Sequence, residues 1–213
     1  MTREGRRPER LVVVLGTGTG VGKTWVAAKV LIRLKAGGAT VAARKPVQSF
    51  APCDPETDAD LLGVATGEPP ERICPRHRWY AMAMAPPIAA AFLGVAPPGL
   101  DELLGELVWP DDAVDIGVLE TVGGPRSPLA VDADSAALAA AVGADLAVLV
   151  AHAGLGAINA VRLCAPFMPA PHVIHLNRFD GSDVADRNLR WLQAEGFDVV
   201  TDLAELARRV AGG

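Results

Sequence analysis

Cysteine is scarce in this chain of 213 residues, which carries only Cys53, Cys74 and Cys164. The three are odd in number and widely spaced, so they do not form a disulfide framework and show no metal-ligand spacing. We therefore expect reduced thiols and a cytoplasmic protein. The four histidines show no ligand spacing either, and no Ser/His/Asp set is recognisable.

Long apolar runs are also missing, although 50% of the residues are hydrophobic. No stretch is long and uninterrupted enough to span a bilayer, so we expect no membrane partner. The charged start is not followed by an apolar segment with a cleavage site, which argues against a signal peptide. We expect residues 1–10 to be a flexible tail and residues 11–213 to form a single α/β domain.

Lysine is rare as well, because arginine supplies 16 of the 20 basic residues. The net charge of -5 and the lack of a basic-aromatic surface argue against a nucleic-acid partner. Two of the four lysines, Lys23 and Lys45, fall in the motifs described next. A compact ammonium is not interchangeable with a guanidinium at a crowded phosphate.

The most informative stretch is LVVVLGTGTGVGKTWVAAK, at residues 11–29. An apolar run typical of a strand meets a glycine-rich turn, and a helical pattern follows. Glycines let backbone N–H groups curl around a polyphosphate, and the positive end of the helix faces the same anion. We expect Lys23 to reach the β- and γ-phosphates and the Thr24 hydroxyl to ligate Mg²⁺. The alternative is a turn that binds nothing, and five rather than the usual four residues separate Gly16 from Gly22.

Apolar strand patterns alternate with helical patterns along the rest of the chain, which favours a parallel sheet covered on both faces. The sequence thus predicts an α/β sandwich of the phosphate-loop NTPase type. Strands are expected at 11–15, 40–43, 114–119, 146–150, 173–176 and 197–200. Helices are expected at 22–36, 57–67, 88–93, 100–108, 134–142, 156–165, 184–195 and 203–210, and residues 68–80 read as irregular.

Polar groups follow the predicted strands at their carboxyl ends: Lys45, Glu120, residues 152–159 and Asn177. In an open α/β sheet these ends converge on one crevice beside the phosphate loop. Lys45 could supply a second cation near transferring phosphate, or it could be an ordinary surface lysine. Glu120 could be a second Mg²⁺ ligand or a solvated strand end.

Three further candidates also have structural alternatives. Asp58 and Asp60 could supply a metal ligand, although acids at a helix start are favoured by the helix dipole alone. Residues 154–159 open a helix whose N–H groups suit a carboxylate, or they form an ordinary strand-to-helix turn. Asn177 offers a donor and an acceptor to a base edge, or it is a turn former.

Taken in order along nearly the whole chain, these motifs resemble the dethiobiotin synthetase family. The matching segments are GTGTGVGKT at 16–24, KPVQS at 45–49, TDA at 57–59, MAPPIAAA at 84–91, ETVGG at 120–124, LGAIN at 155–159 and LNRF at 176–179. The first segment resembles that family's phosphate loop with five spacer residues. The resemblance is most specific there and at 155–159.

The resemblance implies a cytoplasmic, homodimeric ligase that uses ATP, Mg²⁺ and CO₂ to carboxylate 7,8-diaminopelargonate and close its ureido ring. Its catalytic residues would be Lys23 and Lys45, and its metal ligands Thr24, Asp58 and Glu120. Its nucleotide site would comprise Gly18, Thr19, Gly20, Val21, Gly22, Lys23, Thr24 and Asn177. Its substrate site would comprise Thr19, Lys45, Ser49, Gly123, Leu155, Gly156, Ala157 and Asn159.

The chain departs from the family pattern at four places. Thr121-Val122 replaces Gly-Ala after the glutamate, Phe50 replaces a glycine and Ala160 replaces a histidine, all on the substrate side. No Ile-Pro segment follows Asn177 on the base side. Two other readings stay open: a related phosphate-loop ligase for another amine or carboxylate, and a nucleotide switch like the partition ATPases. The latter usually carry an additional lysine where this chain has Gly18.

Overall fold

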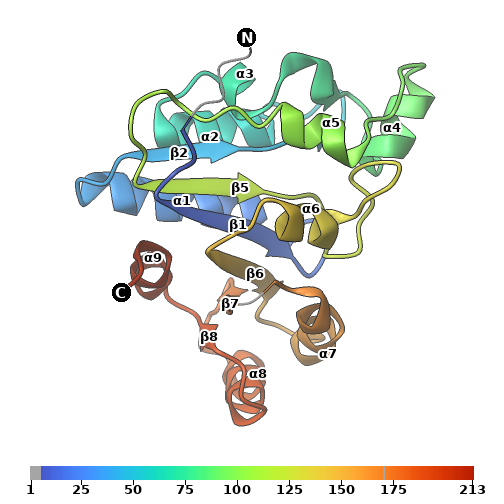
Figure 1. Cartoon of the computed structure of the whole chain (residues 1–213). Coiled ribbons are helices and arrows are strands. Elements are labelled where there is room, and N and C mark those ends of the chain that lie inside the picture. Colours follow the sequence, from blue (N-terminus) through green and yellow to red (C-terminus); the bar gives the residue numbers. More distant parts are fainter. Residues whose placement is uncertain (1–5, 170) are drawn as a thin grey trace.

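Six parallel strands form the central sheet of the computed structural model, which describes residues 6–169 and 171–213 (Figure 1). Their order is β2-β5-β1-β6-β7-β8. The strands are β1 (Arg10–Gly16), β2 (Val41–Arg44), β5 (Ile116–Glu120), β6 (Leu146–His152), β7 (His172–Asn177) and β8 (Val199–Val200). This arrangement confirms the predicted parallel α/β sheet and places β1, with its glycine-rich turn, between β5 and β6.

Helices cover both faces of the sheet, because alternate residues of each strand point to opposite sides. Val12 and Val14 of β1 pack in one apolar cluster, and Leu11, Val13 and Leu15 pack in the other. The first cluster includes α1 (Lys23–Ala36), α2 (Asp58–Thr66), α3 (Pro70–Ile73) and α9 (Leu203–Ala211). The second includes α4 (Pro86–Phe92), α5 (Leu100–Gly105), α6 (Ser135–Ala141), α7 (Ala157–Cys164) and α8 (Asp183–Ala194).

The segment 68–80 is more regular than the sequence predicts. It contains α3, the 3₁₀ turn η1 (Arg76–Arg78) and the short strand β4 (Trp79–Tyr80), which pairs in parallel with β3 (Gln48–Ser49). A second 3₁₀ turn, η2 (Ala165–Phe167), follows α7. Strands of two residues carry no periodic pattern, so the sequence gives no signal for this small second sheet.

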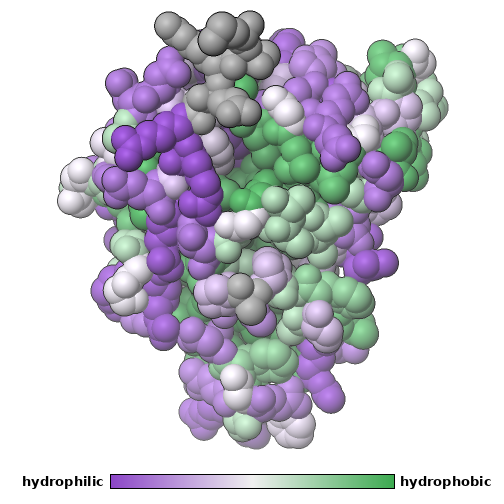
Figure 2. All heavy atoms as spheres, in the orientation of Figure 1, coloured by the Kyte–Doolittle hydropathy of each residue, from purple (hydrophilic) through white to green (hydrophobic). Residues whose placement is uncertain are grey.

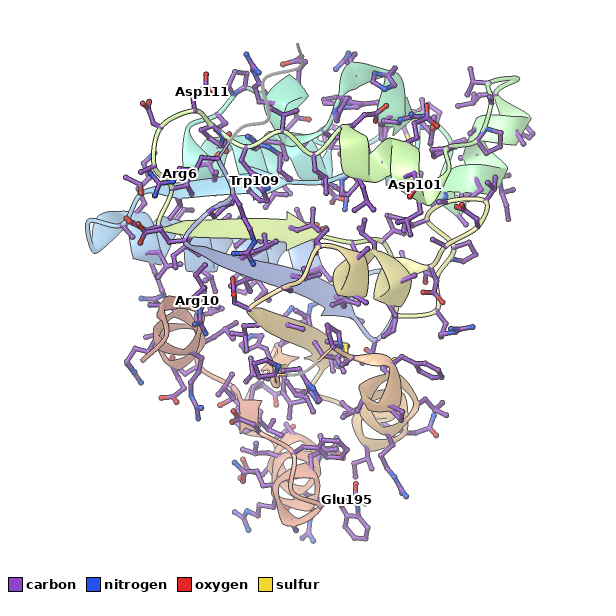
Figure 3. The ribbon with its side chains drawn as sticks, in the orientation of Figure 1. Arg6, Arg10, Asp101, Trp109, Asp111 and Glu195 are labelled. Atoms are coloured by element: carbon purple, nitrogen blue, oxygen red, sulfur yellow. The ribbon has the colours of Figure 1, made fainter. Side chains whose placement is uncertain are left out.

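The prediction of a flexible tail at 1–10 is wrong for residues 8–10, and residues 1–5 lie outside the described residues. Pro8 is buried against Gly117, and the Glu9 N–H donates to the Val114 carbonyl at 2.9 Å. Arg10 is the first residue of β1 and lies beside α9 (Figure 3), where it donates to the Arg209 carbonyl at 3.4 Å. The domain therefore begins at least two residues earlier than expected.

The surface mixes polar and apolar side chains on the face drawn in Figure 2, with apolar atoms gathered over α4 and near α6. Ile88 and Phe92 of α4 are more than half exposed. Within residues 6–169 and 171–213, none of the helices combines the length and hydrophobicity that a membrane span requires.

Candidate nucleotide and metal site

The glycine-rich turn has a backbone that only glycine adopts easily. Gly20 and Gly22 have φ values of 76° and 94°, in the left-handed region. A Cβ atom on Gly22 would lie 2.3 Å from Nδ2 of Asn177, so glycine is also required there for space. The Asn177 amide in turn donates to the Val21 carbonyl at 2.8 Å. The end of β7 thus holds the turn in shape just before α1 begins.

Lys23 lies at the start of α1 and folds back over this turn. Its Nζ donates to the Gly18 carbonyl at 3.2 Å, and the side chain is buried. Burial lowers the pKa of Lys23 relative to an exposed lysine, while the nearby Glu120 carboxylate opposes that effect. A polyphosphate in the turn would replace the carbonyl as the partner of this ammonium group.

Four of the predicted residues meet in one cluster, although they come from four separate parts of the chain. Thr24 Oγ1 lies 2.7 Å from Asp58 Oδ1 and 2.9 Å from Glu120 Oε1. Lys45 Nζ lies 2.8 Å from Asp58 Oδ2 and 2.8 Å from Glu120 Oε1. Lys45 follows β2 and Glu120 ends β5, so the carboxyl ends of these two strands bring the side chains together at one edge of the sheet.

The charges of the cluster are buried and interdependent. Burial lowers the pKa of Lys45, but the two carboxylates outweigh it and hold that pKa above the usual range. Burial raises the pKa of Asp58, and Lys45 more than reverses this. Glu120 is fully buried, and desolvation leaves its pKa above the ordinary value despite Lys45. The cluster therefore holds a fixed cation between two carboxylates of unequal basicity.

The oxygen atoms of the cluster fit a magnesium ion. Glu120 Oε2 is buried without a hydrogen-bond partner in the described part of the chain, an arrangement that a bound cation would relieve. Two carboxylates and one hydroxyl are hard donors, and Mg²⁺ commonly takes few protein ligands and keeps several waters. No group of three or more His, Cys, Asp or Glu with metal-binding geometry occurs within residues 6–169 and 171–213. A site of the observed kind needs only two carboxylates.

The local fold decides between the two candidate aspartates. Thr57 caps α2, and the Asp60 carboxylate accepts hydrogen bonds from the Thr57 N–H at 2.8 Å and hydroxyl at 2.7 Å in a capping box. The Gln48 side chain of β3 accepts from the Ala59 N–H at 3.0 Å and fixes the start of this helix. Asp60 is therefore occupied by the cap, and Asp58 faces the cluster.

A cavity of about 610 Å³ opens beside the cluster, and we call it the phosphate cavity. Thr19, Lys45, Ser49 and Gly123, predicted for the substrate, all line it. The unusual Thr121 points away, because its buried hydroxyl donates to the Val14 carbonyl at 3.3 Å. Val122, from the altered glutamate loop, lines it too, and so do residues that the sequence did not single out: Trp25, Leu61, Ala83, Ser127 and Pro128.

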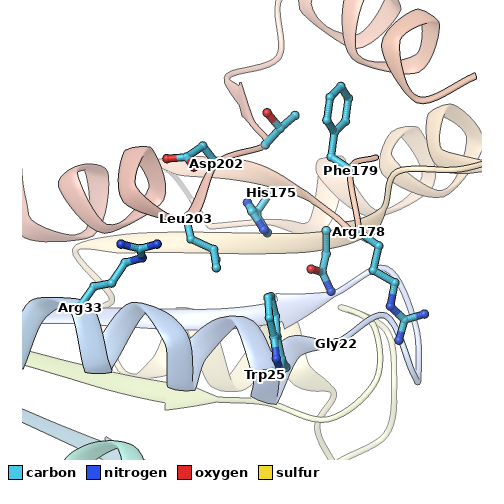
Figure 4. Close-up of a pocket in the computed structure, with 10 residues that line it drawn as sticks. Gly22, Trp25, Arg33, His175, Arg178, Phe179, Asp202 and Leu203 are labelled. Carbon is cyan, nitrogen blue, oxygen red and sulfur yellow. The ribbon is translucent and has the colours of Figure 1, made fainter. Parts of the chain in front are cut away.

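A second cavity, of about 590 Å³, adjoins the first, and we call it the side cavity (Figure 4). It shares Gly22 and Trp25 with the phosphate cavity and is bordered by Asn177. The expectation of one crevice is thus replaced by two adjoining cavities on either side of the phosphate loop. The signal for Trp25 was its position directly after Gly-Lys-Thr.

Residues 155–159, predicted for the substrate carboxylate, line neither cavity. Gly156 precedes α7 with a φ of 92°, and Leu155 is 97% exposed. Asn159 is exposed and Ala157 is buried beneath the helix start. Within one chain, the end of β6 does not deliver this segment to the cluster.

Comparison with known proteins gives matches to sequence families and to solved folds. A family model described as an AAA domain matches residues 10–172. The ATP-dependent dethiobiotin synthetase BioD of Anaeromyxobacter sp. (strain Fw109-5) is 37% identical over 159 residues, which covers 72% of this chain and 68% of the relative. The enzyme of the same name from Haloferax mediterranei is 34% identical over 181 residues, covering 82% of this chain and 74% of the relative.

Solved structures share the fold at low sequence identity. A putative plasmid partition protein from Borrelia burgdorferi B31, bound to AMPPNP, has a TM-score of 0.54 at 13% identity and covers 92% of this chain and 88% of its own. The signal recognition particle receptor FtsY from Elizabethkingia anophelis also has a TM-score of 0.54, at 15% identity, covering 94% and 59%. These likenesses establish the phosphate-loop NTPase fold, and the sequence relatives establish more: this chain belongs to the ATP-dependent dethiobiotin synthetase family of ligases.

Proposed function

We propose that this protein is an ATP- and Mg²⁺-dependent ligase that carboxylates 7,8-diaminopelargonate with CO₂ and closes the ureido ring of dethiobiotin. The observation that carries the proposal is the position of Lys45. Its ammonium group lies within 2.8 Å of Asp58 and Glu120 and lines the same cavity as the phosphate loop. The names of the curated relatives support the same reaction.

Three bond-forming steps make up the proposed reaction. One amine of the substrate attacks the carbon of CO₂ and loses a proton, giving a carbamate. A carbamate oxygen attacks the γ-phosphorus of ATP, ADP leaves, and a carbamic-phosphoric anhydride forms. The second amine then attacks the carbonyl carbon, the C–O bond to phosphate breaks, and the ring closes.

Each step develops negative charge on oxygen, and two lysines supply positive charge beside it. Lys23 and Lys45 offset the charge on the transferred phosphoryl group and on the carbamate. Asp58 and Glu120 hold Lys45 in its protonated form, so it acts as a fixed cation. Thr24, Asp58 and Glu120 would hold Mg²⁺, which, when bound, polarises phosphate oxygens as a Lewis acid.

The walls of the phosphate cavity suit a diamine with a long methylene chain. Met84, Ala85, Pro86 and Val122 offer apolar surface, and Ser49 with Thr19 and Gly123 offers polar groups. Ser49 donates to the Met84 carbonyl at 2.6 Å, so it fixes the loop that leads into α4. Because Thr121 points away, Val122 is the residue through which the altered glutamate loop changes the cavity.

We further propose a homodimer in which residues 155–159 of one subunit bind the substrate carboxylate of the other. Leu155 is almost fully exposed, and Leu163 and Phe167 present further apolar surface on α7 and η2. An interface at this helix would cover these side chains and bring the N–H groups of the helix start to the phosphate cavity of the partner subunit. A monomeric mass by light scattering, measured on protein that still catalyses the diamine-dependent reaction, would contradict the proposed dimer. The free thiols Cys53, Cys74 and Cys164 support a cytoplasmic location.

The reaction is tested by its dependence on the diamine. Purified protein is mixed with MgATP and bicarbonate, with and without 7,8-diaminopelargonate, and released phosphate and product mass are followed. We expect phosphate release only with the diamine, and a product heavier than the diamine by one carbonyl group less two hydrogens. Phosphate release that is indifferent to the diamine would favour a nucleotide switch instead. Dependence on a different amine or carboxylate would favour a related ligase.

A further inference from the structure

The side cavity lies on the other side of the phosphate loop from the cluster, and the proposed reaction assigns no step to it. It runs along α1 from Gly22 and Trp25 toward Arg33 and is closed above by the loop between β8 and α9 (Figure 4). Its volume of about 590 Å³ falls in the range of small-molecule sites. A ligand whose phosphates occupy the glycine-rich turn could extend into it, because Gly22 and Trp25 border both cavities.

Trp25 provides the flat apolar surface of this cavity. It follows Thr24 on the first turn of α1, and in Figure 4 its indole stands up from the helix below His175. The side chain is 49% exposed, whereas Phe179, the other aromatic residue in the lining, is partly buried against the core. The Lys29 ammonium group lies over one face of the indole, 5.9 Å from its centre, so a planar partner would stack on the opposite face.

Two of the polar side chains that line this cavity already have hydrogen-bond partners. The Asn177 amide already donates to the Val21 carbonyl at 2.8 Å, so one of its two N–H donors is occupied. The Asp202 carboxylate accepts from the N–H groups of Ala204 and Glu205 at 2.8 and 2.9 Å to cap α9. Arg33, Arg178 and Thr201 also line the cavity, so ring overlap with Trp25 adds to the polar contacts that the cavity offers to a base.

We propose that Trp25 is the stacking platform for the base of the nucleoside triphosphate, in the side cavity bordered by Asn177, and that it favours purines over pyrimidines. The inference rests on the proposed function, since it needs a triphosphate in the glycine-rich turn. Stacking on an aromatic side chain is tolerant of base identity, because every base has a π-face. The larger rings of purines overlap more of the indole, so ATP and GTP bind in preference to CTP and UTP.

The test separates the base from the phosphates. Wild-type protein, Trp25→Leu and Trp25→Phe are titrated calorimetrically with ATP, GTP, CTP and inorganic tripolyphosphate in the presence of Mg²⁺. We expect Trp25→Leu to weaken ATP and GTP by about tenfold or more and to leave tripolyphosphate unchanged. Trp25→Phe should recover most of the loss. Trp191→Leu, which removes an exposed indole on α8 outside both cavities, should change none of these affinities.

Intrinsic fluorescence gives a second readout. ATP should quench the wild-type emission, tripolyphosphate should not, and Trp25→Leu should abolish the quenching. Equal weakening of ATP and tripolyphosphate would overturn the proposal, because Trp25 would then act through the phosphate loop. Unchanged ATP affinity in Trp25→Leu, with diamine-dependent turnover retained, would also overturn it while leaving the proposed function in place. A wild-type protein that binds neither ATP nor tripolyphosphate would overturn both.

Discussion

The chain uses the same backbone device twice, at the ends of two adjacent strands. After β1 a glycine-rich turn ends at Gly22 and α1 begins, and after β6 a similar turn ends at Gly156 and α7 begins. The two glycines have φ values of 94° and 92°, and neither has a side chain that could cap its helix. Both helix starts therefore offer N–H groups toward the same edge of the sheet.

Their surroundings differ completely. The site of a Cβ atom on Gly22 is filled by the Asn177 amide, and the start of α1 carries Lys23 and lies beside Lys45 and two carboxylates. Around the same site on Gly156, no described atom outside its chain neighbours and the adjoining helix backbone comes within 4 Å. The comparison teaches that a helix start with this backbone becomes a site only through the elements packed around it. The first is completed within one chain, and the second would be completed by the partner subunit of the proposed dimer.

The largest expected effect comes from removing Lys45, the cation of the cluster beside the first of these two helix starts. In Lys45→Met, Asp58 and Glu120 would face each other without the ammonium group that now lies between them. We expect turnover to fall by about 10²–10³-fold, the usual result of removing one charge-stabilising donor. Steady-state phosphate release with the diamine measures the change.

Lys35→Ala is the control for the loss of a lysine outside the site, because Lys35 on α1 lines neither cavity. It should keep near wild-type turnover. Loss of a partner from a buried ion pair also destabilises a fold, so the melting temperature of Lys45→Met is recorded with each assay. A folded Lys45→Met protein with wild-type turnover would show that the cluster is not the reacting centre.

The second largest expected effect is a loss of stability in acid, caused by His175 on β7. Its imidazole is 1% exposed, and burial lowers its pKa from 6.5 to about 4, against the opposing influence of Asp202 and a backbone bond at Val200. Between pH 6.5 and pH 4 the unfolded chain binds a proton that the folded chain does not, so stability falls as the pH falls. The full loss by pH 4 is about 3 kcal/mol.

Urea unfolding at several pH values measures this slope. His175→Gln should flatten it, because glutamine does not titrate, whereas His172→Gln on the same strand is the control for removing a partly exposed histidine. An unchanged acid slope in His175→Gln would mean that other groups carry the acid sensitivity. A flatter slope in His175→Gln would assign the acid sensitivity to β7 and not to the charge cluster beside β1.

Much of the candidate site beside β1 was predictable from the sequence, because its signals are local or follow from topology. The Gly-Lys-Thr turn is read directly, and Lys45 and Glu120 stand where parallel strands end. The choice of Asp58 over Asp60 needed the structure, since either acid suits a helix start. Only the capping box, in which Thr57 takes Asp60, decides between them.

The rest depends on contacts that carry no sequence period. The pairing of β3 with β4 involves two residues on each strand, and the side cavity is formed by loops that meet only in the folded chain. The sequence does not reveal that Trp25 faces a cavity, because half-exposed aromatic residues are common on helices. It also placed residues 155–159 in the same crevice as Lys45, since the rule of converging strand ends does not say how far each turn extends.

The smallest expected effect tests the comparison directly, with Gly22→Ala against Gly156→Ala. A left-handed conformation costs a residue with a Cβ atom about 1–2 kcal/mol, and this cost should be common to both variants. In Gly22→Ala the new atom would also lie 2.3 Å from Asn177 Nδ2, so the amide must move and give up its bond to the Val21 carbonyl. That adds about 1 kcal/mol, seen as a lower urea midpoint for Gly22→Ala than for Gly156→Ala. Equal midpoints would mean that Asn177 does not hold the phosphate loop in place, and the two turns would then differ only in their neighbours and not in their rigidity.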